Sequence, residues 1–473
     1  GSEMCIRDRP NSVRHSLGEY FTPAWIADYV VEKGLSMLDN STKEDWKAID
    51  PCCGSGIFII TLIKKILKHR NIGLSETDKA NLLEEITSRV IGIDLNPISV
   101  LTSRVSYFLS IITLLNNRSN IIIPIYLGDS ARIPQIKRIN EIDCFSYTVN
   151  TIKGNIDISL PVEFVNEETF YDKMADLQTM VKTEDPSRLT RSFIEAMGSV
   201  FSDKLHTHIE DMSNRLIELH KNEWDGIWIR IISNFMLVAK INNIDLIVGN
   251  PPWVKWEHLP QNYANNIKEL CINKSLFSGQ YRMGAISLNI CALIANVTAT
   301  AWLKNDGILA FLMPKTMLTQ DSFEGFRNFF IGNNDRLYLQ QIDNWDGCGT
   351  PFVYTTEKFQ TYYYSRQYVD YTKGVPVTSG VRSLFPRFTS APIDCASTVS
   401  PKGILAHSRP ASSCRELPKI AICSGFVCAS GQEALVCSIA SIIPACVTLI
   451  IGLTSTSSPE SAFSRFSFRF ILI

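Results

Sequence analysis

The sequence has almost no net charge, and this absence limits the partners that it can grip. It carries 46 Lys and Arg against 47 Asp and Glu in 473 residues, a formal net charge of −1 at pH 7. A protein that holds nucleic acid over a large surface usually has a basic excess. The balance allows one basic face that is offset elsewhere. The near-zero net charge predicts that any DNA-binding module in this sequence is small or missing.

Zinc-site spacing and a secretory leader are also missing. There are 13 cysteines, but no CxxC or Cys/His pair has the spacing of a zinc site. We interpret the cysteines as reduced thiols of a cytoplasmic protein, and the adjacent Cys52 and Cys53 as small packing residues. The first residues show no signal peptide.

Both ends of the sequence differ from its middle. Residues 1–10 (GSEMCIRDRP) start without Met and resemble translated adapter sequence, so we treat them as non-native. From residue 375 onward the sequence lacks Asn, Tyr and Trp, although Asn and Tyr are frequent upstream. We therefore predict an out-of-frame or chimeric, poorly ordered tail over 375–473 and one domain over 11–374. The uncharged run 434–453 is long enough for a membrane helix, but its Pro, Ser and Cys disfavour one, and we expect no membrane partner.

Apolar runs that suit buried strands alternate with helical patterns in the middle of the sequence. This alternation predicts an α/β fold, with a doubly wound and mostly parallel sheet. Residues 131–240 interrupt it as a mainly helical insertion without recognisable chemistry, with amphipathic helices over 201–240. The predicted strands cover 46–50, 89–95, 121–127, 244–249, 307–313, 337–342 and 352–364. The predicted helices cover 24–38, 57–67, 98–115 and 287–304.

A glycine-bearing turn follows the first predicted strand. Residues 50–56 (DPCCGSG) lie between that strand and a helix. Gly54 and Gly56 let backbone N–H groups approach a ligand at the start of the helix. The turn lacks the Lys and spacing of a phosphate-binding loop and is not the GxGxxG pattern. Neither a nucleoside triphosphate nor a nicotinamide cofactor is therefore favoured.

Polar residues also stand where later strands end. Asp94 ends the second strand, at a position that commonly accepts hydrogen bonds from ribose hydroxyls. It could instead cap the helix over 98–115, and both roles can coexist. Asp129 and Ser130 follow the third strand.

The strand over 244–249 leads into Asn250-Pro251-Pro252-Trp253. The Asn side-chain oxygen and the Pro251 carbonyl can act as rigid acceptors, because proline fixes φ and has no N–H. Trp253 adds a flat apolar face. Two acceptors beside an aromatic ring suit the exocyclic amine of a planar heterocycle such as adenine. The alternative is an Asx-Pro turn that only closes a strand.

The ordered set of motifs resembles the adenine-N6 DNA methyltransferases of type I and type IIG restriction-modification enzymes. The matching segments are GEYFTP (18–23), DPCCGSGIF (50–58), Asp94, Gly128-Asp129 and NPPW (250–253), within residues 14–364. The sequence departs from the family pattern in having Cys52 for Ala, Trp253 for Tyr or Phe, and a long insertion before NPPW.

The resemblance implies a Rossmann-like fold that binds S-adenosylmethionine. Thr22 and the 54–56 turn would face its methionine part, Asp94 its ribose and Asp129 its adenine amine. Asn250 and the Pro251 carbonyl would accept both N6 hydrogens of a flipped-out adenine, and Trp253 would stack on that base. The implied cofactor-binding residues are Tyr20, Phe21, Thr22, Pro23, Asp50, Pro51, Gly54, Ser55, Gly56, Asp94, Leu95, Asp129 and Ser130. The implied catalytic residues are Asn250, Pro251, Pro252 and Trp253. No metal is implied.

Double-stranded DNA is the implied partner, together with a specificity or restriction subunit or domain that this sequence lacks. Methyl transfer to RNA or to a protein glutamine is an alternative, as is a fragment that binds S-adenosylmethionine or DNA without turnover. Cytosine-C5 methylation needs a nucleophilic Cys, and Cys52 lies in the cofactor turn instead. We find no PD-(D/E)xK nuclease pattern over 11–374.

Overall fold

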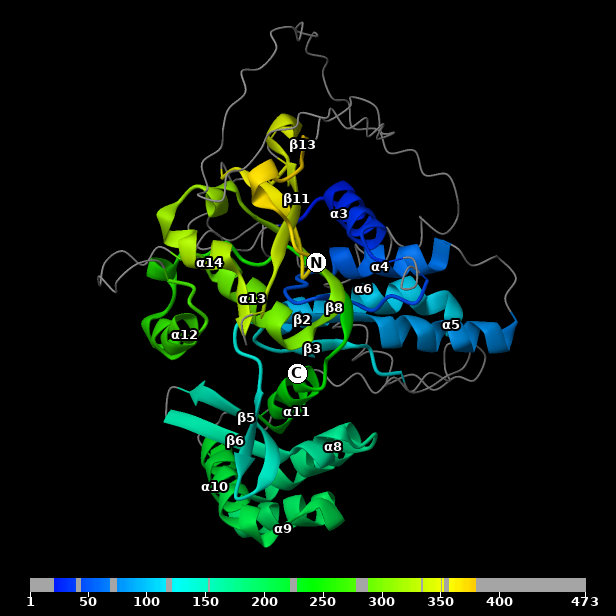
Figure 1. Ribbon diagram of the computed structural model, residues 1–473. Helices are drawn as coiled ribbons and strands as arrows, with labels where there is room; N and C mark the ends of the chain where they lie inside the picture. The colour runs from blue at the N-terminus through cyan, green and yellow to red at the C-terminus, as the bar shows by residue number, and fades with distance from the viewer. Residues whose placement is uncertain are drawn as a thin grey trace, which may run out of the picture.

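The computed structural model describes residues 21–39, 44–68, 75–115, 121–151, 154–221, 228–277, 288–332, 335–349, 351–352 and 357–379. In these ranges helices flank one large sheet, and a smaller lobe extends from it (Figure 1). Residues 1–10, Tyr20 and residues 380–473, which include the apolar run 434–453, lie outside the described residues.

The large sheet has eight strands in the order β13-β11-β12-β8-β7-β1-β2-β3. Every neighbouring pair is parallel except the two pairs that β12 makes with β8 and β11. The prediction of a mostly parallel sheet is therefore confirmed. The strands are β1 Ala48–Asp50, β2 Val90–Asp94, β3 Ile125–Leu127, β7 Ile244–Gly249, β8 Leu303–Pro314, β11 Tyr338–Asn344, β12 Phe359–Ser365 and β13 Val377–Ser379.

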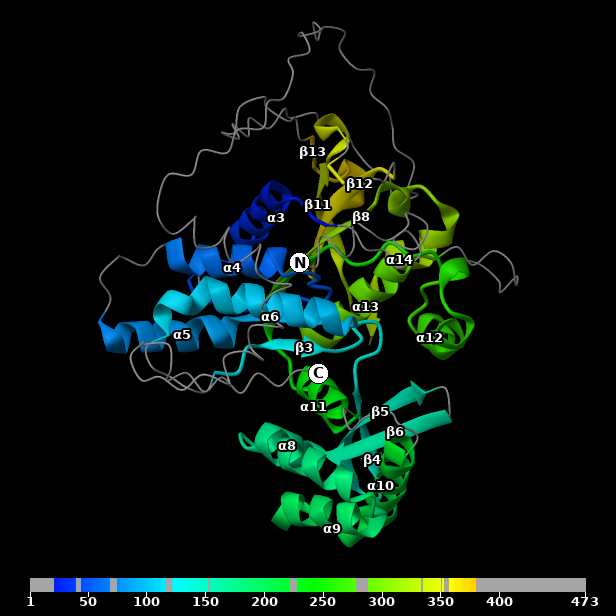
Figure 2. The same ribbon diagram turned by 180° about the vertical axis from the view of Figure 1, so that it is seen from behind.

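Helices cover both faces of the sheet, as a doubly wound fold requires. On one face lie α3 Ala24–Ser36, α4 Ile57–Lys68, α5 Glu76–Arg89 and α6 Pro97–Ile111 (Figures 1 and 2). The opposite face is covered by α13 Ile290–Trp302. Asn96 caps α6 by accepting from the Ile98 N–H, and Ser75 caps α5 in a capping box with Asp78.

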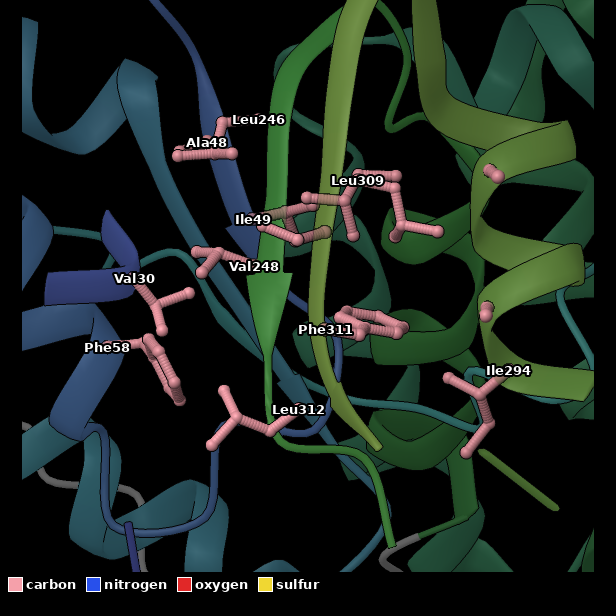
Figure 3. Close-up of a cluster of buried hydrophobic side chains, with 14 of the residues drawn as sticks. Val30, Ala48, Ile49, Phe58, Leu246, Val248, Ile294, Leu309, Phe311 and Leu312 are labelled. Carbon is pink, nitrogen blue, oxygen red and sulfur yellow. The ribbon is translucent and has the colours of Figure 1, made fainter. Parts of the chain in front are cut away.

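The core lies between these two helical layers. Successive side chains of β8 point to opposite faces, so that Phe311 lies toward α13 and Leu312 toward the side of Phe58 (Figure 3). Ile49 in β1 and Val248 in β7 are fully buried. Strands buried on both faces read as continuous apolar runs, which explains why their positions could be predicted.

Residues 135–239 form a second unit, which we call the insertion lobe (Figures 1 and 2). It begins with an antiparallel sheet of three strands, which the prediction of a mainly helical insertion missed. Its strands are β4 Gln135–Ile139, β5 Ile142–Thr151 and β6 Gly154–Pro161, and its helices are α7 Val162–Asn166, α8 Phe170–Met180, α9 Pro186–Met197, α10 His206–Lys221 and α11 Trp228–Ala239. The two last helices correspond to the amphipathic helices predicted over 201–240.

The sheet extends past the predicted boundary at residue 374. β13 pairs in parallel with residues 342–344 of β11, and Val375 is buried. The prediction that the tail starts unpacked at 375 is therefore wrong for residues 375–379, because an edge strand of the sheet offers them backbone partners. The remaining described elements are α12 Gln261–Asn273, α14 Glu324–Asn328, β9 Phe330–Gly332, β10 Asp335–Arg336 and short 3₁₀ turns.

One helical stretch among the described residues, Pro97–Leu114, is long and apolar enough to cross a membrane by length and composition. It consists of α6 and the turn after it. Val100, Ser103, Tyr107 and Ile111 of this stretch are buried, and α6 contacts β2, β3 and α4. The buried side chains of α6 thus belong to one layer of the α/β fold, whereas Ile98 and Leu101 are exposed.

Candidate functional site

The carboxyl ends of β1, β2, β3 and β7 lie at one edge of the sheet, because these four strands are neighbours and parallel. The glycine turn, Asp94, Gly128-Asp129 and NPPW follow these ends, whereas GEYFTP comes before α3. The fold therefore brings together segments that are up to 200 residues apart in the sequence.

In the glycine turn after β1, the Gly54 and Gly56 N–H groups, which the sequence predicts to approach a ligand, donate to Asp94 and to the Cys53 carbonyl. Gly54 and Gly56 have φ values of +53° and +89°, in the region where residues with a Cβ are strained. A Cβ at Gly56 would lie 2.7 Å from Ser103 Oγ in α6, whereas a Cβ at Gly54 would meet nothing within 4 Å. Gly56 thus allows the turn to pack on α6, and Gly54 leaves open space beside the turn.

Asp94 ties this turn to the end of β2. Its carboxylate accepts from the Gly54 N–H at 2.8 Å and from the Asn96 N–H at 2.8 Å. Asn96, and not Asp94, caps α6, so the capping role considered for Asp94 is wrong. Leu95, the next residue, is 56% exposed and presents an apolar surface beside the carboxylate.

Asp50, Pro51, Ser55 and Ser130, four other predicted cofactor residues, take part in hydrogen bonds at the turn. Asp50 is buried and accepts from the Cys52 N–H at 3.0 Å, and burial raises its pKa well above the ordinary value. The Ser130 hydroxyl donates to the Pro51 carbonyl at 2.6 Å. The Ser55 carbonyl accepts from the Ser106 hydroxyl at 3.0 Å. These bonds fix the backbone around the turn.

Asp129 has a partner that the sequence analysis did not find. The Tyr263 hydroxyl of α12 lies 3.2 Å from each Asp129 oxygen, and the Ala131 N–H donates to Oδ1 at 3.0 Å. Burial raises the pKa of Asp129 to about 6, although these hydrogen bonds oppose the rise. Tyr263 escaped notice because a single Tyr in an amphipathic helix has no motif around it.

The Asn250 side chain has two unequal ends. Its Nδ2 donates to Thr22 Oγ1 at 3.2 Å, across 228 positions of the sequence. Its Oδ1 is buried and has no hydrogen-bond partner among the residues that the structure describes. A buried acceptor without a partner is costly and uncommon. This oxygen is therefore a candidate ligand contact.

Trp253 differs from its prediction. An aromatic face open to a base was predicted here, but the side chain is only 6% exposed. Its ring packs on Phe352 and Phe359 with centroids 5.5 Å and 5.6 Å apart, and its Nε1 donates to the Leu312 carbonyl at 3.1 Å. Burial of a large apolar surface explains why the ring turns into the core.

The remaining predicted residues flank these groups. Pro23 starts α3, and its carbonyl accepts from the Ile26 and Ala27 N–H groups. Phe21 is half-buried, Pro251 is buried and Pro252 is half-buried.

The thiols of the turn are poor nucleophiles. Burial, followed by the charge of Asp94, raises the pKa of both Cys52 and Cys53 well above the usual range. Because the thiolate is the reactive form, both side chains stay as thiols at neutral pH. Among the described residues, no group of three His, Cys, Asp or Glu side chains could hold a metal ion.

Three carboxylates and one amide oxygen thus lie at this edge. Carboxylate and amide oxygens accept hydrogen bonds from hydroxyl groups and amines. A nucleoside carries both kinds of donor, and the open space at Gly54 adds room for a ligand beside the turn.

Two family models match the sequence. The model of the N-6 DNA Methylase family matches residues 3–144. The model of the Eco57I restriction-modification methylase family matches residues 88–346. Together they span the turn, the acidic strand ends and NPPW.

Individual relatives match less of the chain. Modification methylase CviBIII of Paramecium bursaria Chlorella virus NC1A is 27% identical over 140 residues, which are 30% of this chain and 32% of that protein. The chain therefore spans about a third of that relative. The cryoEM structure of a DrdV–DNA complex superposes with a TM-score of 0.40 at 13% identity, covering 80% of this chain and 29% of that one. A nuclease-deletion mutant of the Type ISP restriction-modification enzyme LlaGI, in complex with a DNA substrate mimic, gives a TM-score of 0.40 at 13% identity, covering 77% and 24%.

The match to residues 88–346 covers more than half of the 473 residues and contains three of the four strand ends that form the site. The chain belongs to the Eco57I restriction-modification methylase family.

Proposed function

We propose that the chain transfers a methyl group from S-adenosylmethionine to the N6 amine of adenine in DNA, as the modification part of a restriction-modification system. The observation that carries the proposal is the buried Oδ1 of Asn250, an acceptor without a partner among the described residues at the end of β7. An adenine amine has the donor that this oxygen lacks.

The target amine would be held by two acceptors. Asn250 Oδ1 accepts one N6 hydrogen and the Pro251 carbonyl accepts the other. These bonds draw the amine out of conjugation with the ring and localise its lone pair on nitrogen. The new bond then joins N6 to the methyl carbon, the bond from that carbon to sulfur breaks, and one N6 proton leaves to solvent. Positioning and electrostatics supply the catalysis, without a covalent bond to the protein.

Adenine N6 is out of reach inside a stacked duplex, so the base must be flipped out. The two prolines keep the acceptors rigid while the base enters. Stacking of Trp253 on the base stays a prediction. It requires the Trp253 ring, which is buried in the structure, to become accessible to the base.

The residues at β1, β2 and β3 fit the proposed cofactor. Asp94 would accept from the ribose hydroxyls and Asp129 from the adenine amine, with Leu95 against the purine ring and the open side of Gly54 toward the rest of the molecule. Asp50, Pro51, Ser55, Gly56 and Ser130 would keep the turn in shape through the contacts described above. When bound, S-adenosylmethionine supplies an electrophilic methyl group on a sulfonium.

The proposed partner is double-stranded DNA, inside the cytoplasm. A specificity or restriction subunit or domain would supply sequence recognition, because the described residues of this chain contribute mainly the fold and the acceptor edge. We propose these partners because of the family and because of the hydrogen-bond acceptors at the carboxyl edge of the central sheet.

Methyl transfer by the full chain tests the proposal. Tritiated S-adenosylmethionine is supplied with random-sequence duplexes that carry mismatched adenines, since a mismatched base is easier to flip. Wild type should label N6-methyladenine. Asn250→Ala should lower the single-turnover rate by about a hundredfold or more, with cofactor affinity by calorimetry nearly unchanged.

A matched control uses another asparagine near the same strand. Asn242 precedes β7 at its other end and is exposed, so Asn242→Ala should leave the rate intact. Label on a glutamine-containing peptide or on RNA, with none on DNA adenine, would contradict the DNA assignment. Cofactor binding without transfer to any acceptor would identify the chain as a binding fragment.

A further inference from the structure

The two ends of the Asn250 amide are chemically opposite, and only one of them suits the target amine. Oδ1 is an acceptor, whereas Nδ2 carries two hydrogens and is a donor. If the amide were turned over, Nδ2 would face the N6 hydrogens and donor would meet donor. The orientation of this amide therefore decides whether the site can hold an adenine amine at all.

One described side chain bonds to the donor end. Asn250 Nδ2 donates to Thr22 Oγ1 at 3.2 Å, while Oδ1 has no partner among the described residues. With Nδ2 engaged by Thr22, Oδ1 is the end that remains for a ligand. A hydroxyl that accepts one hydrogen bond still has its own hydrogen to donate, so the contact with the methionine part of the cofactor, which the sequence predicts for Thr22, remains open to it.

Thr22 is placed firmly relative to β7. Pro23, the next residue, starts α3, whose Ile26 and Ala27 are fully buried. α3 approaches the strand so closely that a Cβ at Gly34 would lie 2.8 Å from Leu246 Cδ1. The Thr22 hydroxyl and the Asn250 amide are thus each attached to an element that packs against the other.

We propose that Thr22 is a positioning residue for methyl transfer: its hydroxyl accepts from Asn250 Nδ2 and so keeps Oδ1 directed at the amine of the target base. This inference rests on the proposed function. It gives Thr22 a role on the target-base side of the site, beside the contact with the methionine part of the cofactor that the sequence predicts. Donation to that part would leave the hydroxyl only as an acceptor toward Asn250.

Two substitutions at Thr22 test the inference in the full chain. Thr22→Val removes the hydroxyl at nearly constant shape, and Thr22→Ser keeps it. Thr22→Val should lower the single-turnover rate at saturating S-adenosylmethionine by about tenfold, the usual value of one hydrogen bond. Thr22→Ser should restore most of the rate. Cofactor affinity is followed by calorimetry in both variants, so that the rate of each can be compared at saturation.

The matched control is Thr61→Val, which removes a buried hydroxyl that donates to Asp28 between α4 and α3. This variant should leave the rate unchanged. A second readout needs no activity. The side-chain amide signal of Asn250 in ¹⁵N-labelled protein, assigned by its absence in Asn250→Ala, should exchange with solvent about tenfold faster in Thr22→Val than in wild type and Thr22→Ser.

The outcomes separate the two proposals. Wild-type transfer with a full rate and unchanged amide exchange in Thr22→Val would overturn the role of Thr22 and leave the proposed function standing. So would a large loss of cofactor affinity with an unchanged rate at saturation, which would return Thr22 to the cofactor. If wild type transfers nothing to adenine, the proposed function fails, and the exchange experiment still decides whether Thr22 holds the amide.

Discussion

The central sheet and the insertion lobe bury their strands in different ways. β1 and β7 are buried along their whole length, with helices on both faces. β4 of the lobe is exposed over residues 135–138, and Ile136 is 60% exposed. In the central sheet the candidate site is built from residues at the carboxyl ends of four neighbouring parallel strands. The lobe has no such edge, because its three strands are antiparallel and end on both sides.

The two regions also have separate hydrophobic cores. They are joined where α11 meets β3. Asn234 Oδ1 of α11 accepts from the Leu127 N–H and from Arg104 Nη2, both at 3.2 Å. This joint lies two residues from Asp129. The insertion lobe has its own core and is attached beside the carboxyl end of β3. It can therefore hold this strand end in place without contributing residues to the candidate site.

The largest loss of stability should come from removing one large buried ring from each hydrophobic core. Trp253→Ala in the sheet and Phe193→Ala in the lobe should each lower the free energy of unfolding by about 3–5 kcal/mol, because both rings are buried. Hydrogen exchange should show faster exchange in β8 and β12 for Trp253→Ala, and in α8–α10 for Phe193→Ala. If either variant raised the rate of hydrogen exchange equally in both regions, the two cores would unfold as one cooperative unit.

Removing the hydrogen bonds that join α11 to β3 should lower the free energy of unfolding by a smaller amount. Asn234→Ala leaves the buried Leu127 N–H and Arg104 Nη2 without this acceptor, while Arg104 Nε keeps its bond to the Ile125 carbonyl. The loss should cost about 1–3 kcal/mol. Because the joint holds β3, cofactor affinity should fall while the lobe keeps its protection in hydrogen exchange. Asn214→Ala, on α10 of the lobe, serves as the matched control. If the lobe also lost its protection from hydrogen exchange in Asn234→Ala, the fold of the lobe would depend on its contact with the sheet.

The pH dependence of the site should come from Asp129. With a pKa raised to about 6 by burial, the carboxylate takes up a proton as pH falls through 6, and cofactor affinity should drop by at most about tenfold per pH unit. Folding stability should change in the opposite direction. The folded state binds this proton more tightly than the unfolded chain, so stability rises as pH falls from about 6 toward 4. Asp129→Asn should remove both effects, as calorimetry and denaturant unfolding can show.

The smallest expected effect concerns Tyr263. Tyr263→Phe removes a hydrogen bond that lowers the pKa of Asp129, so the pH at which cofactor affinity falls should move upward, and affinity at pH 8 should drop only about two- to tenfold. Phe keeps the ring and its packing. A pH profile identical to that of wild type would show that Tyr263 covers Asp129 without tuning it.

Much of the site could be predicted because its signals are local. A buried parallel strand leaves a continuous apolar run, and the residue after the run lies at the carboxyl edge. Asp94, Asp129 and Asn250 were found in this way. The lobe strands were missed because each is buried on one face only. Ile156, Ile158 and Leu160 are buried at every second position, and this short alternation lies in a stretch whose other segments have helical periodicity.

The sequence by itself determined the α/β class and the order of the motifs along the chain. It also showed a glycine-bearing turn at residues 54–56 and the four strand ends that could meet a ligand. These properties depend on local backbone geometry and on apolar periodicity. Only the tertiary structure decided how side chains from distant segments pair. It turned Trp253 into the core against Phe352 and Phe359, placed Tyr263 on Asp129, and joined Thr22 to Asn250 across 228 positions. Such contacts depend on how helices pack on the sheet, which no local pattern encodes.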